Sequence, residues 1–105
     1  MGGYTPERKP SVTKTLQARM RRYLSIIKFH GIISQTRLAY EAGDSRDAVF
    51  REVIDKLAEA GCIKVITNSA DFVRMKGLDW MNQQMISPNF KKAPVLYEFI
   101  KDLPP

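Results

Sequence analysis

Apolar residues recur at helical spacing through the first part of the chain. They predict a helix from Thr13 or Thr15, either of which is a plausible N-cap, to about His30, and Gly31 ends it. The inward face of this helix consists of Leu16, Met20, Tyr23, Leu24 and Ile27. Lys14, Arg21, Arg22 and Lys28 fall outside that face, so the helix is amphipathic and basic.

A second helix is predicted over the stretch "QTRLAYEA". Ile32 and Ile33 precede it and form a single short strand, Ser34 supplies the N-cap, and Gly43 closes the helix. Its buried candidates are Leu38, Ala39 and Ala42. The linker "GDS" is short enough that the next helix must follow a tight turn.

The third predicted helix covers Ser45–Ala60. Ser45 (or Asp44) caps it, Asp47 in the first turn suits the positive helix end, and Gly61 stops it. The expected inner stripe comprises Val49, Val53, Leu57 and Ala60, flanked by Phe50 and Ile54.

Two β-rich runs, "CIKVIT" and "FVRM", surround the polar connector "NSAD" and predict a hairpin. Helical spacing resumes over Lys76–Met85, and Pro88 ends that element. In residues 95–103 the apolar side chains lie on one side of a possible last helix, which we expect to form a dimer contact or to fold back on its own domain.

The chain has 105 residues, which favours one domain over residues 13–86, with a flexible basic arm at 1–12 and a tail at 87–105. No apolar run reaches the roughly 18 residues of a membrane span. The N-terminus has no apolar stretch of the kind found in secretory signals, so we expect a cytoplasmic protein.

The positive charge is concentrated near the N-terminus. Residues 1–40 carry eight Lys/Arg and one acid, whereas residues 41–105 carry nine Lys/Arg and ten acids. This asymmetry indicates a polyanionic partner, most simply nucleic acid and less often an acidic membrane surface. A soluble face that happens to be basic is the simpler alternative.

Candidate chemistry is sparse. Cys62 is the only cysteine and His30 the only histidine, so neither an internal disulfide nor an ordinary zinc site can form. Cys62 follows a helix-ending glycine, where a small buried apolar residue is normal. The sequence has no phosphate loop, dinucleotide motif or nucleophile elbow. We therefore expect that the protein is not an enzyme and binds no metal and no cofactor.

The order helix, short strand, helix, helix, hairpin, helix gives the chain a family resemblance. "LAYEAGDS" looks like a helix–turn–helix, "LAEAGCIKVI" like the entry into a wing, and "RMKGLDWM" like the segment after a wing. Over Thr13–Met85 the sequence therefore resembles the winged helix-turn-helix superfamily of bacterial and archaeal transcription regulators. The implied fold class is α+β and mainly helical, with a C-terminal helical tail.

This resemblance implies that Ser45–Ala60 is a recognition helix, which enters the major groove of double-stranded DNA. The implied base contacts come from Ser45, Arg46, Asp47 and Arg51. The implied backbone contacts come from Ser34, Gln35, Thr36 and Arg37, from Asn68, Ser69, Arg74 and Lys76 in the wing, and from Arg8, Lys9, Lys14, Arg21 and Arg22 in the arm and first helix. Arg51 has a second interpretation, an exposed ion pair with Asp47 or Asp55.

The recognition helix departs from the usual pattern because it is net acidic by one charge. Either the arm and first helix supply the phosphate affinity, or the helix serves a protein partner. We therefore expect a homodimeric transcription regulator. The alternatives are a DNA-coating, segregation or replication accessory protein and a winged-helix protein-interaction module.

Overall fold

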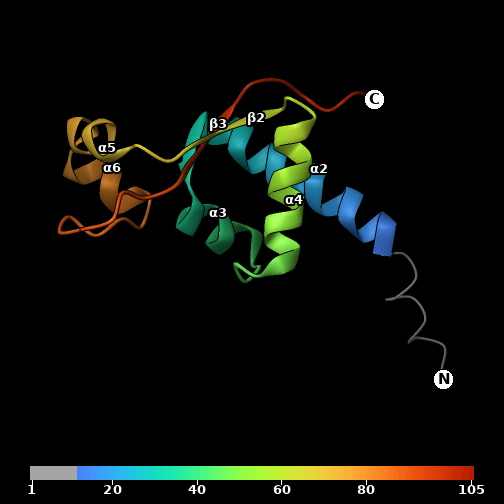
Figure 1. The fold of residues 1–105 in the computed structure, drawn as a ribbon, viewed down its shortest axis with the longest axis horizontal. Coiled ribbons are helices and arrows are strands. Elements are labelled where there is room, and N and C mark those ends of the chain that lie inside the picture. The colour runs from blue at the N-terminus through green and yellow to red at the C-terminus, as the bar shows by residue number, and fades with distance from the viewer. Residues whose placement is uncertain (1–11) are drawn as a thin grey trace.

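Five helices and three strands build the part of the chain that the computed structural model describes, residues 12–105 (Figure 1). The helices are α2 (Val12–His30), α3 (Gln35–Ala42), α4 (Ala48–Glu59), α5 (Ala70–Lys76) and α6 (Leu78–Gln83). The strands are β1 (Ile32–Ser34), β2 (Ile63–Ile66) and β3 (Leu96–Phe99). The fold is α+β and mostly helical, as expected.

The first half of the chain follows the local signals of its sequence. Gly31, with φ at +79°, takes the left-handed conformation that ends α2, and Gly43 does the same for α3. The side chain of Ser34 accepts a hydrogen bond from the amide of Arg37, so the predicted N-cap of α3 is confirmed. Both candidate threonine caps, in contrast, lie inside α2.

The three strands form one antiparallel sheet in the order β1-β3-β2. In the sheet Tyr97 of β3 is opposite both Ile33 of β1 and Val65 of β2. The helix predicted within 95–103 is therefore wrong, because this segment supplies the central strand. Leu96 and Tyr97 are both buried, and burial on both faces removes the alternation that marks a half-exposed strand.

The predicted hairpin strand "FVRM" is also wrong, because these residues lie in α5. Val73 is its one buried residue, and Asp71 in the first turn suits the positive end of a helix. The helix predicted over Lys76–Met85 is found in part, as α6, which begins after Gly77 and ends at Gln83, well before Pro88. A pair of short helices thus stands where a strand followed by a single helix was expected.

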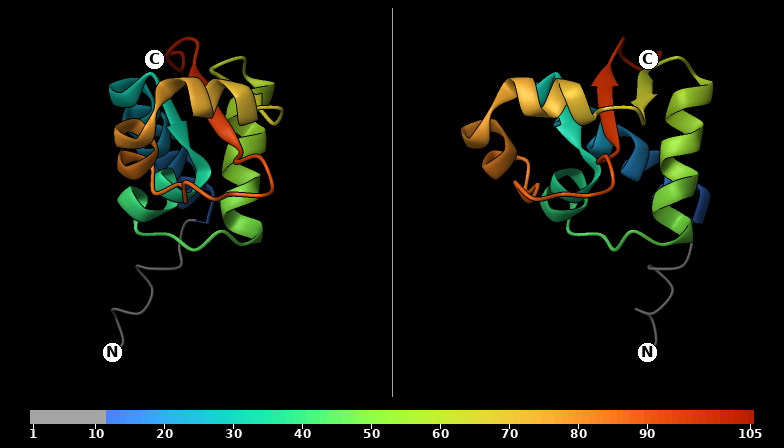
Figure 2. Two further views of the ribbon diagram at one scale, coloured as in Figure 1. Left: turned by 90° about the vertical axis from the view of Figure 1, so that its left-hand side faces the viewer. Right: turned by 60° about the vertical axis from the view of Figure 1, so that its left-hand side comes forward.

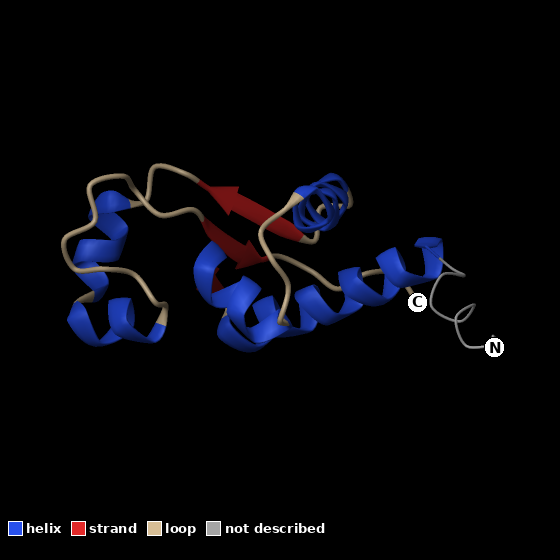
Figure 3. Ribbon diagram, turned by 90° about the horizontal axis from the view of Figure 1, so that it is seen from below, coloured by secondary structure: helices blue, strands red, loops and turns tan. Residues whose placement is uncertain are grey.

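Two hydrophobic clusters occupy the two faces of the sheet. The larger joins α2, α3 and α4 to one face and includes Tyr23, Phe50 and Tyr97. The smaller joins α5 and α6 to the other face through Val73, Met81, Ile86 and Leu96. Figure 3 shows α5 and α6 at one end of the molecule, connected to the strands by two loops.

Candidate nucleic-acid interface

The N-cap of α4 is Asp47, whose carboxylate accepts hydrogen bonds from two backbone amides of the first turn. The predicted cap at Ser45 (or Asp44) is wrong, and the helix begins at Ala48. Several residues of this turn are chemically able to cap. In the structure it is Asp47 that accepts from the amides of Val49 and Phe50, and Phe50 itself is 1% exposed.

Helix α4 buries one face in the core and exposes the other. The buried residues are Phe50, Val53, Ile54 and Leu57. Val49, expected in the inner stripe, is 43% exposed instead, and Ala60 is exposed as well. Arg46, Asp47 and Arg51 are exposed at the start of the helix, where the sequence predicted contacts with a partner.

Asp44 anchors the turn before α4 to the first helix. Its Oδ2 accepts hydrogen bonds from Nη1 of Arg19 at 3.0 Å and from the hydroxyl of Tyr23. Burial and the neighbouring Asp44 carboxylate raise the pKa of Tyr23 well above its usual value. The contact was missed from the sequence, although the hydroxyl of a buried tyrosine usually has a hydrogen-bond partner.

The start of α3 is less open than expected. Ser34 is 1% exposed, and its hydroxyl donates to the backbone carbonyl of Gln84. Nε2 of Gln35 donates to the hydroxyl of Tyr97, and Arg37 binds Glu41 and the carbonyl of residue 83. Three of the four side chains predicted to touch a DNA backbone here are thus engaged within the protein.

Thr36, the fourth of these residues, is hydrogen-bonded to Arg46 and lies in a hollow with two cations. Nη1 of Arg46 donates to Oγ1 of Thr36 at 3.3 Å, and both residues line a cavity of about 260 Å³ together with Lys92. Figure 2 shows the turn between α3 and α4 on the same side of the molecule as the segment that leads into β3. Lys92 was missed because nothing in the sequence brings residues 91–95 back to α3.

The four residues assigned to the wing are dispersed. Asn68 is exposed, whereas Ser69 is fully buried and donates to the carbonyl of Pro94. Arg74 lies over the ring of Phe90, at 4.7 Å from its centroid, and Lys76 lies on a different surface beside Trp80. These side chains therefore do not form one continuous edge.

The remaining predicted cations lie on α2 or before it. Arg21 and Arg22 are exposed. Arg8 and Lys9 lie outside the described residues, and Lys14 lies in α2 with its side chain outside the description. Arg51 makes no ion pair within residues 16–105, so the predicted pairing with Asp47 or Asp55 is absent there.

No family model, curated protein or solved structure matches the chain at a significant level. Within residues 12–105, none of the helices combines the length and the apolar character that crossing a bilayer requires. In the same residues, His, Cys, Asp and Glu nowhere gather in groups of three or more that could hold a metal ion.

Proposed function

We propose that the protein binds double-stranded DNA with the start of α4 and the hollow that Thr36, Arg46 and Lys92 line. The observation that carries the proposal is this hollow, in which two exposed cations and a hydroxyl surround a space of about 260 Å³ beside an open helix start. Ammonium, guanidinium and hydroxyl donors are the groups that fix a DNA phosphate in register.

The order of elements supports the same proposal. A helix, a short strand, two helices and a further strand follow each other through β2, and this first part of the order agrees with what the resemblance to winged helices implies. Residues 67–95, with α5 and α6, stand between β2 and β3 in place of a short wing. In this arrangement Arg51 faces a major groove while Arg46 and Lys92 hold the adjacent phosphate.

The test is a gel-retardation titration of the variant Arg46→Ala/Lys92→Ala against random and selected duplexes. We expect affinity to fall by on the order of tenfold, because two charge contacts are lost. The matched control is Lys64→Ala/Lys101→Ala, which removes the same charge from exposed positions outside the hollow. Equal losses in both variants would show that only net charge matters and would contradict the proposed surface.

A homodimeric regulator stays the specific form of the proposal, although the helix expected to join the subunits is absent from residues 95–103. A footprint confined to one short palindrome supports a regulator. Protection that grows along the duplex supports a coating, segregation or replication accessory protein instead.

The outer face of α4 favours a second candidate function, docking of a protein. Arg51 and Lys56 are outnumbered there by the exposed acids Glu52, Asp55 and Glu59. An acidic face disfavours close contact with phosphates along most of the helix. Failure to retard any duplex, with capture of a stable protein partner, would select this function over DNA binding.

A further inference from the structure

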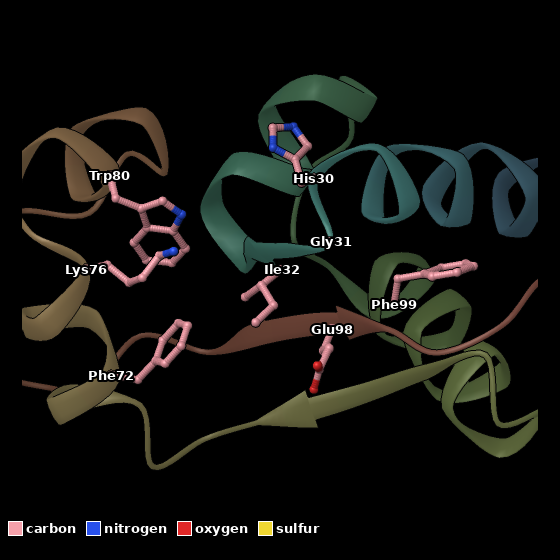
Figure 4. A pocket seen from close by; sticks show the side chains of 8 residues that line it. All are labelled: His30, Gly31, Ile32, Phe72, Lys76, Trp80, Glu98 and Phe99. Carbon is pink, nitrogen blue, oxygen red and sulfur yellow. The ribbon is translucent and has the colours of Figure 1, made fainter.

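The second face of the sheet is only partly covered. The cluster formed by α5 and α6 covers Leu96 and packs against Ile32, which stays half-buried, and Glu98, opposite Ile32 in the register, is half-buried too. A cavity of about 360 Å³ lies over this uncovered part (Figure 4). Its size falls within the range of small-molecule sites, roughly 300–1,000 Å³.

One wall of this cavity is aromatic. The rings of Phe72 in α5 and Trp80 in α6 meet edge to face, with centroids 5.9 Å apart and an interplanar angle of 89°. Figure 4 shows both rings on the side of the cavity opposite the sheet. Such a wall favours a flat unsaturated ring as the occupant, because aromatic pairs gain stability beyond the area they bury.

Two opposite charges frame the same cavity. Nζ of Lys76 lies 5.9 Å from the ring centre of Phe72 and 5.6 Å from that of Trp80. Glu98 lies across from it on β3, and neither Lys76 nor Glu98 takes part in an ion pair within residues 16–105. Each charge is therefore free to meet a group of a ligand.

The backbone at Gly31 leaves further room beside these groups. This glycine lines the cavity, and a side-chain carbon placed on it would meet nothing within 4 Å. His30, also on the rim, is already hydrogen-bonded through Nε2 to Glu41. Lys76 and Glu98 thus remain as the two charged groups that select a ligand.

We propose that this cavity binds a small molecule with a flat aromatic ring, an anionic group for Lys76 and an N–H donor for Glu98. The ring lies against Phe72 and Trp80, and the two charged side chains fix its orientation. Adenine nucleotides and aromatic amino acids both have this chemistry. The proposal is independent of DNA binding, since none of these four side chains lines the hollow at Arg46.

The experiment uses the fluorescence of Trp80, the only tryptophan of the chain. The full chain is titrated with adenosine monophosphate and, separately, with L-phenylalanine, and ribose 5-phosphate serves as the probe without a ring. We expect a saturable change with at least one ring-bearing probe and none with ribose 5-phosphate. The probe that saturates distinguishes a nucleotide site from an amino-acid site.

Variants separate this site from general attraction to a basic protein. Lys76→Met should weaken binding on the order of tenfold, because the charged contact is lost while the apolar stem remains. Glu98→Gln should weaken it as well, whereas Lys56→Met, a control at an exposed position of α4 outside the cavity lining, should not. No saturable change with either ring-bearing probe, or the same affinity in all three variants, would overturn the proposal.

Discussion

At the scale of single residues, the Asp44 carboxylate determines how the turn before α4 is held. It takes hydrogen bonds from Arg19 and Tyr23 on α2, so the turn is attached to the longest helix of the described chain. The side chain of Asp44 is 17% exposed, and a charged acceptor so placed is costly to leave without its donors. The carboxylate therefore positions the start of α4, and Arg46 with it.

Replacing Tyr23 with phenylalanine tests this tether. The variant keeps the ring in the core but removes one donor from a charged, partly buried acceptor, so the free energy of unfolding should fall by about 1–2 kcal/mol. Urea unfolding measures the change. Tyr40→Phe is the matched control, because Tyr40 is 68% exposed and should have almost no effect. Equal stabilities of Tyr23→Phe and the parent would mean that the hydroxyl does not hold the turn.

At the scale of elements, local signals predicted α2, β1 and α3 well and the rest less well. Glycines and caps act within a few residues of their own position, and α3 begins and ends where its serine and glycine indicate. The strand β3 was mistaken for a helix because its partners, β1 and β2, lie thirty or more residues away in sequence. Long-range pairing overrides local pattern here, whereas "FVRM" lies in α5, whose Val73 packs against Leu96 of the sheet.

The residues of the candidate DNA-binding surface, like the elements of the fold, were predictable from the sequence only in part. Exposure of Arg46 and Arg51 follows from helical spacing and was predicted. Burial of Ser34 and the arrival of Lys92 both depend on the segment that returns to form β3. No local pattern contains that information, so the surface could be outlined but not completed from the sequence.

Glu41 of α3 connects this helix to α2 through His30 and provides a prediction at this scale. Burial opposes its ionisation, but hydrogen bonds from Arg37 and His30 outweigh that effect and hold the pKa of Glu41 below its usual value. A lowered folded-state pKa means that the stabilisation is present above the unfolded-state pKa and is lost as pH falls through the folded-state value. The parent should therefore be more stable than Glu41→Gln at neutral pH.

The measurement is the unfolding free energy of both proteins over a series of decreasing pH values. The advantage of the parent should shrink through the acidic range in which carboxylates protonate. A difference that stays constant with pH would mean that Glu41 contributes by packing rather than by charge.

At the scale of the whole molecule, the net charge and the positions of the exposed cations together affect how the protein would bind a charged polymer. The chain carries a net charge of +6, and its described residues extend from α2 at one end to α5 and α6 at the other (Figure 1). Arg21, Arg22, Arg46 and Lys92 are exposed on three separate segments. Affinity for a charged polymer should therefore arise from many weak contacts, whereas preference for a sequence depends on the few residues at the start of α4.

The salt dependence of binding tests whether contacts to the DNA backbone supply most of the affinity. If about six to ten phosphates are neutralised, duplex affinity should fall by on the order of a thousandfold or more between roughly 50 and 200 mM salt.

Deleting residues 1–11, which include Arg8 and Lys9, should lower affinity evenly across sequences and reduce the slope of log affinity against log salt by at most about 2. Arg51→Ala should instead reduce the preference for a selected duplex over a random one. An affinity that hardly changes with salt would contradict a backbone-dominated interface, and a deletion that alters sequence preference would mean that residues 1–11 take part in recognition.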